Sequence, residues 1–209
     1  MPKVSRRTLL TTYGLAPLAG GVLAQESHFP SVSSREIIRQ RYFPNVTLLT
    51  HENKKVRFYD DLIKDKIVTI SFMYVNCEGV CPGITANLLK VQKLLGSRVG
   101  KDIFMYSITL KPEQDTPQEL KKYVEMHGIG PGWVFLTGQP NDVELLRRRL
   151  GFTDPDPERD ADKANHIGNV RYGNEALQLW AACPGQADPQ WIAESISWVD
   201  WPKNKTAKS

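Results

Sequence analysis

The stretch Ile70-Ser71-Phe72-Met73-Tyr74-Val75-Asn76-Cys77-Glu78-Gly79-Val80-Cys81-Pro82 decides how this chain is expected to fold. It opens as an apolar run rich in β-forming residues and ends with two cysteines four residues apart, followed by a proline. Proline is favoured in the first turn of a helix, so the pattern predicts a buried strand that leads into a helix. Residues four apart share a helix face, so the two thiols are expected to lie together.

Two thiols at the start of a helix have three possible roles. The positive end of the helix favours thiolate, and two thiolates can close a disulfide or hold a soft metal ion. One inserted residue separates this spacing from the C-x-x-C of thioredoxin-like redox proteins. The plain alternative is a pair of buried, unreactive cysteines. The spacing alone leaves these roles open.

The first 24 residues have the features of an export signal. The segment Ser5-Arg6-Arg7-Thr8-Leu9-Leu10 is a twin-arginine pattern, an interrupted apolar stretch follows, and small residues precede Gln25. We therefore expect residues 1–24 to be a twin-arginine signal peptide and the protein to be periplasmic. The apolar stretch is too short for a good membrane span. If the signal is not cleaved, it would instead keep the protein associated with the membrane.

Composition narrows the class of protein. Cleavage after Ala24 removes three positive charges and lowers the formal net charge from +4 to +1. Basic runs interleaved with aromatic residues do not occur, so nothing in the sequence predicts nucleic-acid binding. The remainder, about 185 residues, suits a single domain. Three cysteines are too few for a disulfide-stapled scaffold.

The mature part is expected to contain a linker, one domain and a short tail. Residues 25–44 are polar and aperiodic, and we interpret them as a linker. The domain is expected to span residues 45–201, with a polar tail at residues 202–209. Within it, β-rich runs alternate with helical patterns, after a hairpin at residues 45–59. A second hairpin is expected to turn at Gly173-Asn174.

This order of elements predicts an α/β fold with a central mixed sheet flanked by helices and an N-terminal hairpin. Helices are expected from Pro82, from Thr116-Pro117, from a capping box that begins at Asn141, and over residues 189–199. The cysteine pair then lies beyond the carboxyl end of a central strand, where open α/β sheets place their functional sites.

Four motifs together resemble the Sco/SenC family. Cys77-Glu78-Gly79-Val80-Cys81-Pro82 resembles its C-x-x-x-C-P, and the segment from Ser107 to Pro117 resembles its S-x-D-P-x-x-D-T-P. The segments Phe58–Leu62 and Leu136-Thr137-Gly138 also agree with the family pattern. The resemblance runs from about Asn45 to Val199, which is nearly the whole mature chain.

The resemblance implies a thioredoxin-like fold, a copper site and a role in respiratory oxidase assembly. In that family two cysteines and one late histidine bind copper, which here would be Cys77, Cys81 and His166. Asp115 is either a residue that supports the copper loop or simply the entry to the next helix. Two positions depart from the family pattern. Lys111 stands where the family has an aspartate, and Asn165 stands where the family usually has an aspartate before the ligand histidine.

The donor set agrees with this implication. Two thiolates and one imidazole suit Cu(I), and an added oxygen ligand would also accommodate Cu(II). A structural zinc site would normally require a fourth ligand. Cys183 has no thiol or histidine nearby in the sequence, so we expect a packed thiol, with an auxiliary metal or redox role as the alternative.

Two classes of function follow. The first is a periplasmic copper chaperone that passes copper to a respiratory acceptor, above all the dinuclear copper centre in a subunit of cytochrome oxidase. The second is an enzyme, a thiol-disulfide oxidoreductase that keeps the cysteines of an acceptor reduced and is itself recycled by a thiol reductant. The metal role requires His166, whereas dithiol exchange requires only Cys77 and Cys81.

Overall fold

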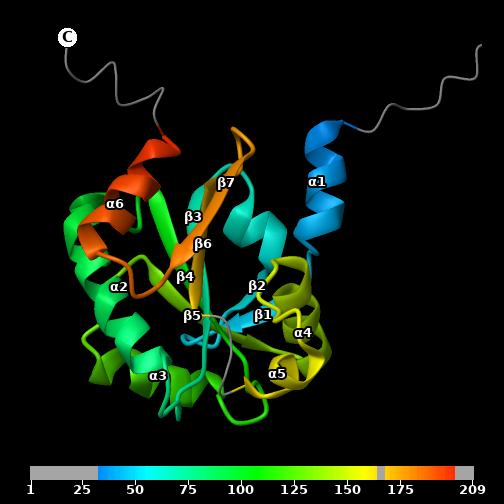
Figure 1. Cartoon of the computed structure of the whole chain (residues 1–209), viewed down its shortest axis with the longest axis vertical. Helices are drawn as coiled ribbons and strands as arrows, with labels where there is room; N and C mark the ends of the chain where they lie inside the picture. The colour runs from blue at the N-terminus through cyan, green and yellow to red at the C-terminus, as the bar shows by residue number, and fades with distance from the viewer. Residues whose placement is uncertain (1–32, 164–167, 201–209) are drawn as a thin grey trace, which may run out of the picture. The chain divides into compact units, whose positions relative to one another are not determined.

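A seven-stranded mixed β-sheet forms the centre of the computed structural model, which describes residues 33–163 and 168–200 (Figure 1). The strand order is β2-β1-β5-β4-β3-β6-β7. The three central strands β3, β4 and β5 are parallel to one another, and every other neighbouring pair is antiparallel. The strands are β1 (Thr47–Thr50), β2 (Lys55–Arg57), β3 (Ile67–Met73), β4 (Ile103–Thr109), β5 (Trp133–Gly138), β6 (Asn169–Asn174) and β7 (Leu179–Pro184).

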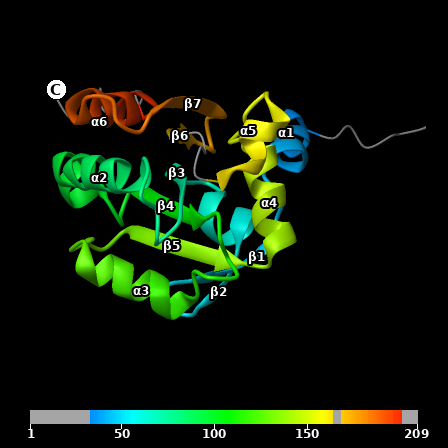
Figure 2. The same ribbon diagram turned by 60° about the horizontal axis from the view of Figure 1, so that its bottom comes forward.

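Helices cover both faces of this sheet, as the alternating sequence predicts. The α-helices are α1 (Ser34–Tyr42), α2 (Cys81–Leu95), α3 (Pro117–Met126), α4 (Pro140–Arg149), α5 (Pro157–Ala161) and α6 (Pro189–Trp198). Helices α2, α3 and α6 lie to one side of the strands, and α1, α4 and α5 lie to the other (Figures 1 and 2). Every residue of β3 is buried, because this strand is central and covered on both faces.

Short elements complete the described chain. A single π-helical turn, Phe58–Ile63, leads into β3, and a 3-10 turn, Gly96–Arg98, follows α2. No helix in residues 33–163 and 168–200 is long and apolar enough to cross a membrane. The expected signal peptide and the polar tail lie outside the described residues.

A side-chain cap explains where α3 begins, whereas α4 begins without one. The Thr116 side chain accepts a hydrogen bond from the N–H of Glu119, and Pro117 occupies the first turn, as predicted for α3. The predicted capping box at Asn141 is wrong, because α4 already begins at Pro140. The residue before it, Gln139, makes no side-chain cap.

The C-terminal hairpin turns later than the sequence suggests. Gly173 and Asn174 belong to β6 and pair with Trp180 and Leu179, and the chain turns at residues 175–178. A Cβ atom at Gly173 would lie 2.4 Å from the Trp180 ring, so this glycine permits close packing rather than a turn. The left-handed residue of the turn is Gln178, with φ of 55°.

The expected aperiodic linker contains a helix, α1, and this corrects the sequence interpretation. Ser33 caps it by accepting the N–H of Glu36, and Glu36 pairs with Arg39 one turn later. Arg35 also forms an ion pair with Glu175, 140 residues away, whose side chain is buried. This long-range contact holds a segment whose composition alone does not predict a helix.

Candidate functional site

The two cysteines lie where the central strand β3 gives way to α2, beyond the carboxyl end of the parallel strands. Cys77 lies in the loop between these elements and Cys81 is the first residue of α2. Both are buried, with 7% and 1% of their surface exposed. Pro82 follows in the first turn of the helix, as the sequence predicts.

The two sulfurs are close enough to hydrogen-bond, and their environments differ. Burial raises the pKa of the Cys77 thiol, but hydrogen bonds from the Cys81 thiol, the Tyr74 hydroxyl and two backbone N–H groups outweigh it and lower this pKa overall. Burial, together with the hydrogen bond to Cys77, raises the pKa of Cys81. Cys77 is therefore the more readily ionised of the two cysteines, with Cys81 as its hydrogen-bond donor.

Tyr74 is a member of this site that the sequence analysis did not identify. It follows β3 directly, is 4% exposed, and its hydroxyl hydrogen-bonds to Cys77. This hydrogen bond and burial raise the pKa of Tyr74, so it remains a neutral donor. Tyr74 lies three residues before Cys77, which could have marked it as a candidate, but the sequence does not show where its ring points.

Asp115 connects the neighbouring loop to the cysteine loop. Its buried carboxylate accepts hydrogen bonds from the backbone N–H of Val75, at 3.1 Å, and from the Thr109 hydroxyl. Burial raises the pKa of Asp115, and these two hydrogen bonds oppose that shift. Asp115 also precedes the N-cap Thr116, so the same residue supports the approach to Cys77 and stands at the entry to α3.

Lys111 reaches the same place from the loop after β4. Its Nζ atom lies 4.0 Å from the centroid of the Tyr74 ring. The parallel pairing of β3 with β4 brings the two residues together, since Met73 pairs with Thr109 and the N–H of Leu110 donates to the Met73 carbonyl. A cation over an aromatic face is attracted by the ring quadrupole.

The third expected ligand, His166, lies outside the described residues. Within residues 33–163 and 168–200, no group of three or more His, Cys, Asp or Glu side chains could hold a metal ion. Cys183 is a free, buried thiol on β7, and burial raises its pKa to about 11. The structure thus brings Cys77, Cys81 and the Asp115 loop together.

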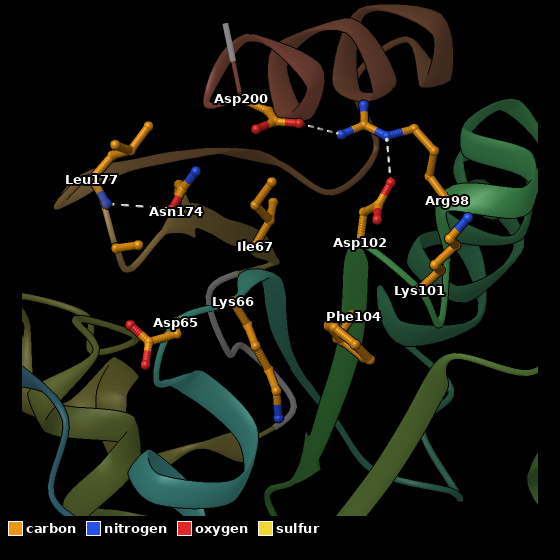
Figure 3. Close-up of a pocket in the computed structure, with 11 residues that line it drawn as sticks. Asp65, Lys66, Ile67, Arg98, Lys101, Asp102, Phe104, Asn174, Leu177 and Asp200 are labelled. Carbon is orange, nitrogen blue, oxygen red and sulfur yellow. Dashed lines mark hydrogen bonds and ion pairs between the residues drawn. The ribbon is translucent and has the colours of Figure 1, made fainter. Parts of the chain in front are cut away.

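A cavity at the opposite end of the sheet is separate from this site. It measures about 480 Å³ and lies where β3 and β4 begin (Figure 3). Arg98, whose guanidinium pairs with Asp200 at 2.8 Å, closes one side, and Lys66 and Asp65 line another. Its position at the amino ends of the parallel strands places it far from Cys77.

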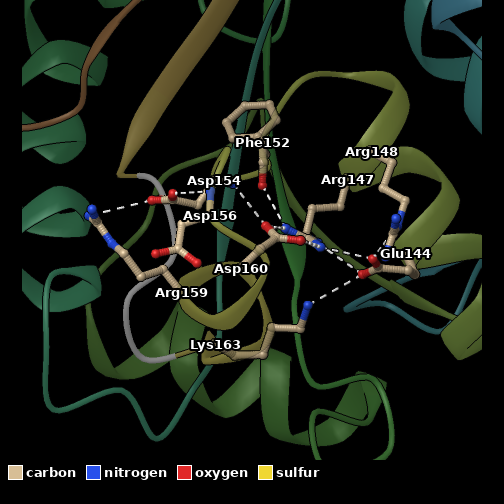
Figure 4. A network of polar contacts seen from close by, with 9 residues as sticks. All are labelled: Glu144, Arg147, Arg148, Phe152, Asp154, Asp156, Arg159, Asp160 and Lys163. Carbon is tan, nitrogen blue, oxygen red and sulfur yellow. Dashed lines mark hydrogen bonds and ion pairs between the residues drawn. The ribbon is translucent and has the colours of Figure 1, made fainter.

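A polar cluster around Arg147 holds the loop at residues 152–163, which follows α4. Buried Arg147 pairs with Asp160 and Glu144 and donates to the carbonyl of Phe152 (Figure 4). The Phe152 ring packs on Phe72 of β3, with centroids 4.8 Å apart. This cluster ties the acidic loop after α4 to the strand that carries the cysteines.

Comparison with known proteins agrees with the fold and the motifs. The family described as SCO1/SenC matches residues 39–199. A SCO1 protein homolog of Bacillus subtilis is 34% identical over 77 residues, which cover 36% of this chain and 39% of the relative. A putative copper-binding protein of Stutzerimonas stutzeri is 25% identical over 134 residues, covering 63% of this chain and 64% of the relative. The matches therefore span less than two thirds of either relative.

The fold is shared with solved structures. The crystal structure of yeast Sco1 with copper bound superposes with a TM-score of 0.60 at 21% identity, covering 78% of this chain and 92% of that one. At this identity the likeness establishes the thioredoxin-like fold, with its mixed sheet flanked by helices, and the predicted fold class is confirmed.

Proposed function

The chain belongs to the SCO1/SenC family, and from this premise we propose that it binds one copper ion and delivers it to a respiratory copper protein. The observation that carries the proposal is the pair of adjacent sulfurs at Cys77 and Cys81, presented at the carboxyl end of the central parallel strands. A relative and a solved structure of the same fold are named as copper-binding or hold copper.

The residues present fit a soft cation. Two sulfurs within hydrogen-bonding reach can both turn toward one metal ion, and two thiolates prefer Cu(I). We propose His166 as the third ligand, which completes a trigonal set, and an oxygen ligand would be added for Cu(II). Asp115 and Tyr74 would hold the cysteine loop in position, as residues around metal ligands commonly do.

We further propose that the acceptor is the dinuclear copper centre of a cytochrome oxidase subunit and that transfer takes place in the periplasm. Ligand exchange requires an acceptor to reach the cysteine pair, which lies in a loop and at a helix start beyond the carboxyl ends of the parallel strands. The twin-arginine pattern at Arg6-Arg7 supports the periplasmic location.

Titration of the reduced protein with Cu(I) against a competing chelator tests the metal site. We expect about one copper per chain. Cys77→Ser, Cys81→Ser and His166→Ala should each weaken binding strongly, whereas His51→Ala, at a hairpin turn away from the cysteines, should not. If His166→Ala leaves the Cu(I) affinity unchanged while Cys77→Ser abolishes binding, the proposal that three residues bind the copper is wrong.

A second candidate function is favoured by the unequal thiols. A stabilised Cys77 thiolate beside a protonated Cys81 is the arrangement that dithiol exchange requires, since the thiolate attacks and the second thiol resolves the mixed disulfide. Reduction of an acceptor disulfide by the protein, with His166→Ala fully active and Cys77→Ser inactive, would establish this oxidoreductase role.

A further inference from the structure

Two glycines bring the ends of β6 and β7 against the first turn of α2. Gly168 precedes β6 and Gly185 follows β7, and the N–H of Gly185 donates to the Gly168 carbonyl at 2.7 Å. A Cβ atom at Gly168 would lie 2.8 Å from Cδ1 of Ile84, and one at Gly185 would lie 2.9 Å from Cγ2 of the same side chain. Neither glycine has a positive φ, so the close approach, and not a left-handed backbone, requires glycine at both positions.

Ile84 lies three residues after Cys81 and is held firmly in this junction. It is 5% exposed, so its side chain has little room to turn away from the two glycines that it packs against. Asn87, one turn further along α2, donates to the carbonyls of Gly185 and Ala187 at 3.0 and 2.7 Å. The start of α2 is therefore fixed against the end of β7 by packing and by hydrogen bonds.

The strand register places Gly168 beside the cysteine loop. Val170 of β6 pairs with Ser71, close to the carboxyl end of β3, so the residues just before Val170 lie where β3 ends and the cysteine loop starts. A Cβ atom at Gly168 would also lie 3.7 Å from Cγ2 of Val80, the residue before Cys81. Gly168 thus lies next to the helix turn that carries one of the two sulfurs.

The proposed third ligand is tied to the same junction by the chain itself. His166 stands two residues before Gly168, and two residues of chain span at most about 7 Å. The close approach of Gly168 to Ile84 therefore limits how far His166 can lie from the helix turn that begins at Cys81.

We infer that Gly168 is a positioning residue of the proposed copper site: without a side chain, it lets the segment after His166 close onto the helix turn that begins at Cys81. This role rests on the proposed function and deepens it. A methyl group at this position pushes the first turn of α2 away from the start of β6. Cys81 then moves relative to Cys77, whose loop is held by Asp115, and the two sulfurs no longer meet one metal ion as in the parent.

Gly168→Ala tests this role in two measurements on the full-length mature protein. It should weaken Cu(I) binding about tenfold in the chelator titration, as loss of a group that supports metal ligands does. It should also shift the equilibrium with glutathione about threefold toward the dithiol, because a displaced Cys81 meets Cys77 less readily. In that reaction two protein thiols and oxidised glutathione give the protein disulfide and two reduced glutathione molecules, with two electrons transferred.

Two further variants make the test specific. Ile84→Val deletes the Cδ1 atom that the new methyl group would meet, so Gly168→Ala should have little effect in that background. Gly138→Ala is the matched control: its Cβ atom would lie 2.8 Å from Cδ2 of buried Leu48, where β5 pairs with β1, and β5 is two strands away from β3. It introduces the same kind of overpacking, yet should leave both measurements unchanged.

The outcomes separate this role from the proposed function. If the protein takes up no copper, a shift of the glutathione equilibrium in Gly168→Ala still supports the role, because that equilibrium reports the position of Cys81 without metal. If copper binds and Gly168→Ala matches Gly138→Ala in both measurements, the role of Gly168 is wrong and the copper site stands. Failure of Ile84→Val to restore the parent's values would equally overturn the role, because the contact with Ile84 would then not be the cause.

Urea unfolding of each variant confirms that the measurements are made on folded protein. If Gly168→Ala does not fold, Ile84→Ala takes its place, since it empties the same contact from the side of the helix. Ile84→Ala should also weaken Cu(I) binding and shift the glutathione equilibrium toward the dithiol, and parent values in both measurements would overturn the role.

Discussion

The carboxylate of Asp115 accepts the backbone N–H of Val75 at 3.1 Å, and this hydrogen bond helps to hold the loop after β4 against the segment that carries Cys77. The same oxygen also accepts the Thr109 hydroxyl. The position of the cysteine turn therefore depends on a residue 40 positions away in the chain.

Removal of this acceptor should cost stability and copper affinity together. Asp115→Ala leaves the N–H of Val75 without its acceptor, which should lower the free energy of unfolding by about 2 kcal/mol. Urea unfolding and Cu(I) titration measure the two effects. Glu113→Ala, an exposed carboxylate in the same loop, is the control. Equal stability of both variants would show that the hydrogen bond to Val75 contributes nothing.

Two adjacent arginines should differ sharply. Arg147 has 4% of its side chain exposed and pairs with Glu144 and Asp160, whereas 64% of the Arg148 side chain is exposed (Figure 4). Arg147→Ala leaves Asp160 without its ion-pair partner in a partly buried cluster and should lower the free energy of unfolding by about 3 kcal/mol. Arg148→Ala should cost at most about 0.5 kcal/mol. Similar losses, measured by urea unfolding, would contradict the assignment of Arg147 as the anchor.

Protonation of Glu175 should lower the stability of the protein in acid. Burial raises its pKa, but hydrogen bonds from Arg35, the Asp65 N–H and the Tyr59 hydroxyl prevail and lower it below the ordinary 4.5. A lowered folded-state pKa stabilises the protein above pH 4.5, and this stability is lost as the pH falls through the folded-state value. Glu175→Gln should therefore lose less stability than the parent between pH 7 and about pH 3.5 in urea unfolding. A parallel loss in both proteins would argue against this role.

Copper binding should depend on the redox state of one cysteine pair. A Cys77–Cys81 disulfide removes two ligands at once, so the oxidised apo-protein should take up little Cu(I), and a dithiol reductant should restore binding. Cys183→Ser should match the parent in both steps, because Cys183 is buried on β7. Full copper binding by the oxidised protein, or loss of binding in Cys183→Ser, would overturn this division of the three cysteines.

Export should depend on the arginine pair. Arg6→Lys combined with Arg7→Lys keeps the charge but alters the twin-arginine address, and should leave the precursor in the cytoplasm. Cell fractionation followed by immunoblotting measures the distribution. A normal periplasmic yield of the double variant would show that another export route is used.

Local patterns in the sequence predicted the elements that carry the cysteines. The apolar, β-branched run before Cys77 is typical of a buried central strand, and Pro82 is suited to the first turn of a helix, so β3 and α2 could be predicted from local sequence. Thr116 likewise predicted the start of α3, because its side chain caps the helix. Such signals act over a few residues and need no partner elsewhere in the chain.

Only the tertiary structure decided the environment of the sulfurs and the positions of α1 and the C-terminal hairpin. Lys111 meets Tyr74 because β3 and β4 pair in one particular parallel register, and α1 is held by a glutamate 140 residues further along the chain. A glycine is required at position 173 because the Trp180 ring packs against it, and not because the chain turns there. These contacts join residues far apart in sequence, and their free energy is realised only after the chain has packed, so no local pattern can encode them.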